Sequence, residues 1–106
     1  IGSIAEQFVA QEFAAYSAEN TPPELYYWQR ESKSSNAEVD FLATHQGSIV
    51  PIEVKANVKG GMKSLRVFLD THKKSNYGLK ISEQFYSQHG ALKEIPFYGI
   101  EAWMKE

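Results

Sequence analysis

The chain has 106 residues, the length of one compact domain, and we treat residues 1–106 as a single domain. Hydrophobic residues make up 42% of the chain and charged residues 23%, which is ordinary globular usage and argues against a disordered chain. No apolar run is long enough to cross a bilayer, so we expect no membrane partner. The chain has no cysteine, which excludes disulfides and cysteine-ligated zinc; we expect a cytoplasmic protein.

The formal net charge of −2 hides an uneven distribution of charge along the chain. Residues 55–80 hold seven of the 11 basic residues and one acid, and the rest of the chain is acidic. A basic segment of this kind is typical of a surface that binds a polyanion such as nucleic acid. The alternative is a solvated helix face that binds nothing.

Residues 2–18 are predicted to form a helix, because large apolar residues recur at spacings of three and four: Ile4, Phe8, Val9, Phe13 and Tyr16. Pro22 and Pro23 end the helical pattern. The aromatic residues 25–30 then favour a strand.

Two further strands are predicted at residues 37–44 and 49–56, joined by a turn at residues 45–48. In the second of these strands the alternation of side chains places Val50, Ile52 and Val54 on one face and Glu53 and Lys55 on the other. Pro51 within this strand needs a position where no backbone donor is required.

The second half of the chain begins with a predicted helix over residues 62–73, with Leu65, Phe68 and Leu69 facing inward. Residues 77–81 alternate as a strand, residues 82–91 favour a loop or a short helical turn, and residues 95–98 favour a last short strand. Ile100, Ala102 and Trp103 form a packing tail. The expected fold is therefore a single α/β sandwich or α+β layer structure.

Asp40, Glu53 and Lys55 are the residues most suggestive of chemistry. Mg²⁺ prefers oxygen ligands, usually one or two carboxylates with water and phosphate, and two acids on adjacent strands can share one ion. The backbone carbonyl of Val54 can add a ligand, and Lys55 can orient an attacking water or stabilise developing charge. The alternative is three exposed strand charges, which disagrees with the position of Glu53 between apolar Ile52 and Val54.

The order of these motifs resembles a known nuclease superfamily. A leading helix with Gly2 and Glu6, then Asp40, then Glu53-Val54-Lys55 is similar to the PD-(D/E)XK nucleases, in particular the group around Holliday-junction resolvases. The strings GSIAEQFVAQEF, ELYYWQR and EVDFLATHQGSIVPIEVKAN resemble more closely the DUF4143 family, a domain found at the C-terminus of AAA-type ATPases. Val39 stands where the superfamily name has Pro.

This resemblance implies a restriction-endonuclease-like α-β-β-β-α-β core, with a central mixed sheet flanked by helices. It implies that Glu6, Asp40, Glu53 and Lys55 are catalytic, and that Asp40, Glu53 and the Val54 carbonyl bind Mg²⁺ or Mn²⁺. The expected function is metal-dependent hydrolysis of DNA, in a fragment of a longer chain with an N-terminal ATPase domain. A non-catalytic DNA-binding or protein-interaction module is the alternative, and a homo-oligomer stays open.

Two assignments remain open at this point. Glu12 competes with Glu6 as the acid of the first helix, since Glu12 falls inside the apolar stripe on an ideal helical wheel. Lys63, Arg66, Lys73 and Lys74 are the expected phosphate contacts, since they follow the strand that carries Glu53 and Lys55. A solvated helix face explains the same four residues equally well.

Overall fold

The computed structural model describes residues 2–17, 25–27, 39–56, 60 and 62–106. In chain order the elements are α1 (Gly2–Ser17), β1 (Leu25–Tyr27), β2 (Phe41–His45), β3 (Ser48–Val54), α2 (Met62–Thr71), β4 (Gly78–Ser82), β5 (Ser87–His89), β6 (Leu92–Pro96), the 3-10 helix η1 (Phe97–Gly99) and α3 (Ile100–Met104). Within these described ranges, no helix combines the length and the apolar character that crossing a membrane requires.

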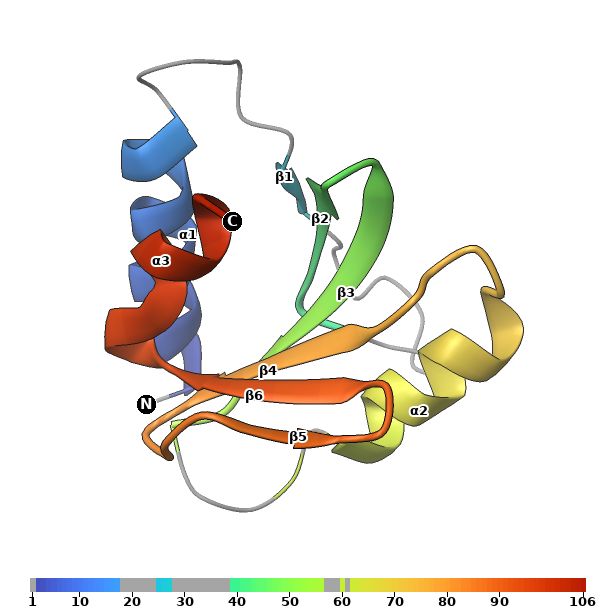
Figure 1. Ribbon diagram of the computed structural model, residues 1–106. Coiled ribbons are helices and arrows are strands. Elements are labelled where there is room, and N and C mark those ends of the chain that lie inside the picture. The colour runs from blue at the N-terminus through green and yellow to red at the C-terminus, as the bar shows by residue number, and fades with distance from the viewer. Residues whose placement is uncertain (1, 18–24, 28–38, 57–59, 61) are drawn as a thin grey trace.

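The strands form a six-stranded mixed sheet in the order β1-β2-β3-β4-β6-β5. Strands β3, β4 and β6 are parallel neighbours, whereas β1–β2, β2–β3 and β5–β6 are antiparallel pairs. Helices α1 and α3 lie together on one side of the sheet and α2 lies on the other (Figure 1). The expected mixed sheet flanked by helices is therefore confirmed.

The β2–β3 hairpin closes through the turn that its sequence predicts. His45 pairs with Ser48, and the two residues between them, Gln46 and Gly47, have φ angles of 53° and 81°. A two-residue turn with two positive φ angles matches the right-handed twist of the flanking strands. The tight turn fixes the register of the hairpin, and the register decides which side chains of β3 face each side of the sheet.

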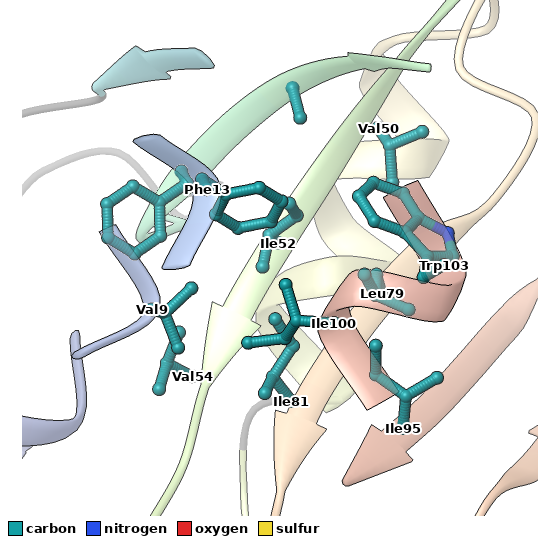
Figure 2. Close-up of a cluster of buried hydrophobic side chains, with 12 residues drawn as sticks. Val9, Phe13, Val50, Ile52, Val54, Leu79, Ile81, Ile95, Ile100 and Trp103 are labelled. Carbon is teal, nitrogen blue, oxygen red and sulfur yellow. The ribbon is translucent and has the colours of Figure 1, made fainter. Parts of the chain in front are cut away.

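The larger core lies between the sheet and the α1–α3 pair (Figure 2). Val50, Ile52 and Val54 all belong to it, together with Val9 of α1 and other buried apolar residues of β4, β6 and α3. Burying each such aliphatic side chain contributes about 1.5–3 kcal/mol. The predicted alternation along β3 is confirmed, and it leaves Glu53 on the face that α2 covers.

The inward face of α1 differs in part from its predicted apolar stripe. Val9 and Phe13 are buried as expected, but the side chain of Ile4 is 69% exposed and that of Phe8 is 43% exposed. Small residues, Ala5 and Ala10, pack against the core instead. The helix therefore turns Ala5, Val9, Ala10 and Phe13 toward the core and leaves Ile4 and Phe8 exposed.

Pro51 lies at a position in β3 where strand pairing needs no backbone N–H donor. It pairs with Leu42 of β2. The N–H of Lys55 donates to the Ile81 carbonyl of β4 at 2.9 Å, so alternation turns the nitrogen of Pro51 toward the β4 side as well. Pairing between β3 and β4 begins only at Ile52 and Leu79. The proline thus precedes the ladder, and β3 can be an interior strand.

The C-terminal third contains three elements that the sequence pattern did not indicate, β5, η1 and α3. The segment expected to be a loop or a helical turn contains β5, an exposed strand held by antiparallel pairing with β6. The last strand begins at Leu92, not Ile95. The expected packing tail is helical, with Ile100 and Trp103 buried and Ala102 exposed.

The remaining predicted boundaries agree with the structure to within a few residues. The second helix ends at Thr71, whose hydroxyl donates to the carbonyls of Val67 and Phe68 at 3.1 Å. Residue 18 of the first predicted helix, residues 28–30 of the first strand and residues 37–38 of the second lie outside the described part of the chain.

Candidate metal centre

Asp40 directly precedes β2 and its carboxylate is bound to the backbone of β3. Its N–H donates to the Ile52 carbonyl at 3.0 Å, and its Oδ2 accepts the N–H of Val54 at 2.8 Å. The regular pairing of β2 with β3 ends at Phe41 and Ile52. Beyond it, the N–H of Val54 is bonded to the side-chain oxygen of Asp40 where a regular ladder would offer a backbone carbonyl. Asp40 is only 5% exposed, and this hydrogen bond fixes its carboxyl group at the end of the hairpin.

Glu53 belongs to a row of buried charges that crosses three parallel strands. It is 2% exposed and lies opposite Lys80 of β4. Lys80 in turn lies opposite Glu94 of β6, so acid, base and acid alternate across the sheet. Leu92, two residues before Glu94, packs with Leu65 and Phe68 of α2, which identifies the covered face.

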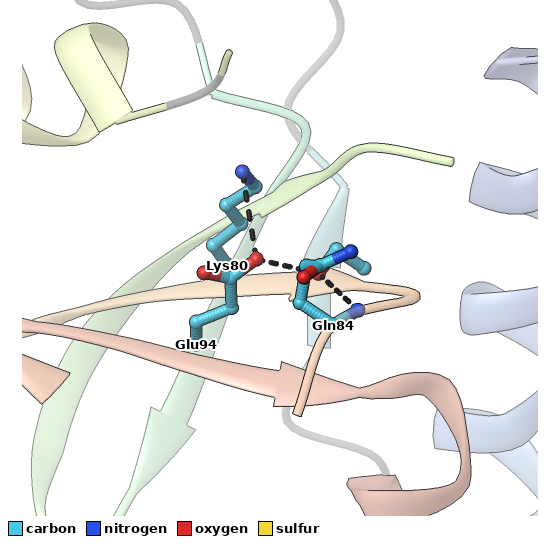
Figure 3. A network of polar contacts seen from close by, with 4 residues as sticks. Lys80, Gln84 and Glu94 are labelled. Atoms are coloured by element: carbon cyan, nitrogen blue, oxygen red, sulfur yellow. Dashed lines mark hydrogen bonds and ion pairs between the residues drawn. The ribbon is translucent and has the colours of Figure 1, made fainter. Parts of the chain in front are cut away.

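The Lys80–Glu94 part of this row is organised by Ser82 (Figure 3). The Lys80 Nζ lies 3.5 Å from Glu94 Oε2, and the Ser82 hydroxyl donates to the same oxygen at 2.6 Å. The backbone N–H of Gln84 donates to the Ser82 oxygen at 3.1 Å. Each group therefore orients the next one, from the Gln84 N–H through Ser82 and Glu94 to Lys80.

Lys55 follows Glu53 by two residues and shares its face of the sheet. It is half-buried, and its backbone N–H donates to β4, so the strand geometry persists to this residue. Gly60, at φ +98°, lies against the lysine stem: a Cβ built there would be 3.6 Å from Lys55 Cε. Gly60 therefore lies close to the aliphatic part of the Lys55 side chain.

The donor set of Asp40, Glu53 and the Val54 carbonyl consists of oxygens, as Mg²⁺ and Mn²⁺ prefer. In an extended strand the N–H and C=O of one residue point to the same side, so the Val54 carbonyl lies on the side of Asp40. Among the described residues, no three His, Cys, Asp or Glu side chains are grouped to hold a metal. The candidate is therefore a centre of two carboxylates and one carbonyl, to which water would add ligands.

The two acids of α1 differ in their surroundings. Val9 lies beside Val54 in the core (Figure 2), and Glu6 precedes Val9 by one helical turn, so Glu6 lies toward the end of β3. Glu12 is engaged on its own helix. Its carboxylate accepts a hydrogen bond from Tyr16 and raises the pKa of that hydroxyl to about 12. This hydrogen bond accounts for Glu12, and Glu6 as the acid of the centre stays a prediction.

The family of the chain follows from a comparison with known proteins. Residues 1–99 match the family described as Domain of unknown function (DUF4143). The chain belongs to this family. No curated protein and no solved structure matches it.

The basic residues of this DUF4143 domain divide into an exposed and a buried group. Lys63 and Arg66 are exposed on α2, and Lys73 and Lys74 are exposed in the turn that follows it. Lys80, from the same basic stretch of sequence, is 3% exposed and paired with Glu94. The basic surface is thus smaller than the sequence count indicates.

Sequence reasoning missed three polar residues of the DUF4143 domain's buried row: Lys80, Ser82 and Glu94. Lys80 stands between Leu79 and Ile81, two fully buried residues of the larger core. A charge between buried neighbours predicts a polar group on the other covered face of the sheet. The same signal was used for Glu53, and it would have identified Lys80 as well.

Proposed function

We propose that this DUF4143 domain is a metal-dependent nuclease-like phosphodiesterase that acts on DNA with Mg²⁺ or Mn²⁺. The observation that carries the proposal is the buried Asp40 carboxylate, held by the Val54 N–H at 2.8 Å in the hairpin that also buries Glu53. The element order α1, β1–β3, α2, β4 supports a restriction-endonuclease-like core. The domain would follow an AAA-type ATPase domain in a longer chain, which is a proposal drawn from the sequence resemblance alone.

Each residue has a distinct chemical task in this proposal. Asp40, Glu53 and the Val54 carbonyl hold the cation, which when bound offsets phosphate charge and acidifies a water. Lys55 orients that water or stabilises the charge that develops on the phosphate. Glu6, from α1, accepts hydrogen bonds from water near the centre. Lys63 and Arg66 on α2, with Lys73 and Lys74 beyond it, contact the DNA backbone.

Cleavage assays with branched, linear and single-stranded DNA test the catalytic role of Lys55. We expect cleavage that requires Mg²⁺ or Mn²⁺, and a loss of roughly 10²–10⁴-fold in rate for Lys55→Ala, the range of a positioned proton-transfer group. Lys105→Ala is the control, because Lys105 is exposed and paired with Glu101 on α3. The proposal would be contradicted if the wild-type protein cleaved none of these DNAs and Lys55→Ala changed nothing.

Two variants of Asp40 separate metal binding from folding. Asp40→Asn keeps a side-chain oxygen for the Val54 N–H, so we expect a small change in the free energy of unfolding. Asp40→Ala leaves a buried N–H unpaired and should destabilise the fold by about 1–3 kcal/mol. Both variants should lose Mn²⁺ binding in calorimetric titrations. Normal Mn²⁺ affinity in Asp40→Asn would show that this carboxylate is structural.

A second function, a non-catalytic DNA-binding module, is favoured by the position of Lys80. The sheet places this lysine directly opposite Glu53, so a protein cation already accompanies that acid. In this case the exposed basic side chains of α2 and of the turn after it would bind DNA. Asp40 and Glu53 would only support the fold. Salt-sensitive DNA binding without cleavage and without Mn²⁺ binding through Asp40 and Glu53 would identify this second function.

A further inference from the structure

Three buried polar residues, Lys80, Ser82 and Glu94, have no task in the proposed reaction. Lys80 is 3% exposed, Ser82 is fully buried and Glu94 is 8% exposed. A buried ammonium group is costly unless carboxylates surround it. In the sheet Lys80 has an acid opposite it on each side, Glu53 on β3 and Glu94 on β6.

The contacts on the β6 side are built with more precision than charge neutralisation requires. One carboxylate oxygen, Glu94 Oε2, receives both the Ser82 hydroxyl at 2.6 Å and the Lys80 ammonium at 3.5 Å. The Gln84 N–H holds the Ser82 oxygen in place (Figure 3). The Lys80 Nζ is therefore held 3.5 Å from Glu94 Oε2, on the strand next to the one that carries Glu53.

We propose that Ser82, Glu94 and Lys80 form a positioning network that sets the affinity of the Glu53 site for a divalent cation. The inference rests on the proposed metal-binding function. Lys80 is a fixed positive charge near the carboxylate that is to receive a second positive charge, so it weakens cation binding. Glu94 opposes this effect, because its negative charge, 3.5 Å from the Lys80 Nζ, offsets the Lys80 charge.

The test is a calorimetric titration of the protein with Mn²⁺ at one pH, with no DNA present. Lys80→Met removes the competing cation and should tighten Mn²⁺ binding, on the order of tenfold for one nearby charge. Glu94→Gln removes the negative charge that offsets Lys80 on β6 and should weaken binding by a similar factor. Both variants break the same ion pair, yet their effects on affinity should have opposite signs.

A purely structural ion pair predicts a different pattern. Breaking it from either side would loosen the sheet, and both single variants would bind Mn²⁺ more weakly or without change. The double variant Lys80→Met/Glu94→Gln removes the charges of Lys80 and Glu94 together and keeps an acceptor for Ser82. Such paired removal usually leaves a fold stable. The Mn²⁺ affinity of the double variant should return to within about threefold of wild type, because the opposed effects cancel. If Lys80→Met does not fold, comparing the double variant with Glu94→Gln still tests the positioning network.

The outcomes distinguish this inference from the function on which it rests. Wild-type protein that binds no Mn²⁺ through Asp40 and Glu53 would overturn both. The positioning network alone would be overturned if the wild-type protein binds Mn²⁺ but the affinities of both single variants shift in the same direction. The same conclusion would follow if the double variant binds Mn²⁺ as weakly as Glu94→Gln.

Discussion

At the residue scale, His45 has an unusual environment for an imidazole. It is 9% exposed and its ring stacks on Trp103, with ring centroids 4.2 Å apart. Its Nε2 makes no hydrogen bond with any described residue. Burial lowers the pKa of His45, the Lys93 charge lowers it further, and the Glu106 charge raises it. The folded protein therefore favours the neutral ring.

This environment predicts that acid destabilises the fold through His45. As the pH falls below about 6.5, the ordinary pKa of histidine, the unfolded chain binds a proton that the folded chain does not. The free energy of unfolding therefore decreases toward pH 5. His45→Phe, which keeps the aromatic stack, should flatten this pH dependence in urea titrations between pH 5 and 7.5.

His89→Gln is the matched control for this experiment, because His89 is exposed on β5. We expect it to leave the pH dependence of the free energy of unfolding as it is in wild type. A steep acid dependence that survives His45→Phe would assign the effect to other groups.

At the element scale, α3 is short but strongly anchored. Trp103 packs edge-on against Phe13 of α1 at 5.9 Å between ring centroids, and its Nε1–H donates to the Tyr77 hydroxyl at 2.9 Å. Lys93 lies over the Tyr77 ring at 4.5 Å. The helix thus joins α1, the start of β4 and β6, although its five residues could not be stable alone.

Truncating this anchor should destabilise the whole domain. Trp103→Ala is expected to lower the free energy of unfolding by about 3–5 kcal/mol, because it leaves a cavity and an unpaired Tyr77 hydroxyl. Trp103→Phe, which loses the hydrogen bond but keeps part of the packing, should cost less. Glu101→Ala on the same helix removes an exposed pair with Lys105 and should cost at most about 0.5 kcal/mol. Equal effects of Trp103→Ala and Glu101→Ala in urea unfolding would show that α3 is not an anchor.

At the scale of the whole molecule, the two sides of the sheet differ in exposed charge. On one side, α2 and the turn after it carry four exposed basic residues and one exposed acid, Asp70. On the other, α3 and the residues after it carry the exposed acids Glu101 and Glu106 and one exposed basic residue, Lys105 (Figure 1). A molecule with a net charge of −2 can still offer a basic face to DNA.

This difference in charge predicts how DNA binding depends on salt. If the four basic side chains contact phosphates, replacing all four should reduce the slope of log affinity against log salt concentration by up to about 3.6. The fourfold variant is Lys63→Gln/Arg66→Gln/Lys73→Gln/Lys74→Gln. Fluorescence anisotropy at several salt concentrations measures the slope. Lys105→Gln on the opposite side should not alter it. An unchanged slope in the fourfold variant would place the DNA on another face.

Much of the fold could be predicted because local patterns determine it. The alternation along β3 and the period of α2 placed their buried residues correctly, and Gly47 marked a tight turn. Strand β5 was missed because its residues Ser87, Gln88 and His89 are polar and exposed. Its strand form comes from backbone pairing with β6, which leaves no hydrophobic pattern in the sequence.

The candidate site shows the same division between what the sequence by itself determined and what only the tertiary structure decided. The residue types and spacing of Asp40, Glu53 and Lys55 identified an oxygen-rich hairpin, because chemistry and strand period are local properties. The bond from Val54 to Asp40 and the row from Glu53 through Lys80 to Glu94 depend on strand register. Register is settled by which strands become neighbours when the core is buried, and β6 joins β4 only in the folded sheet.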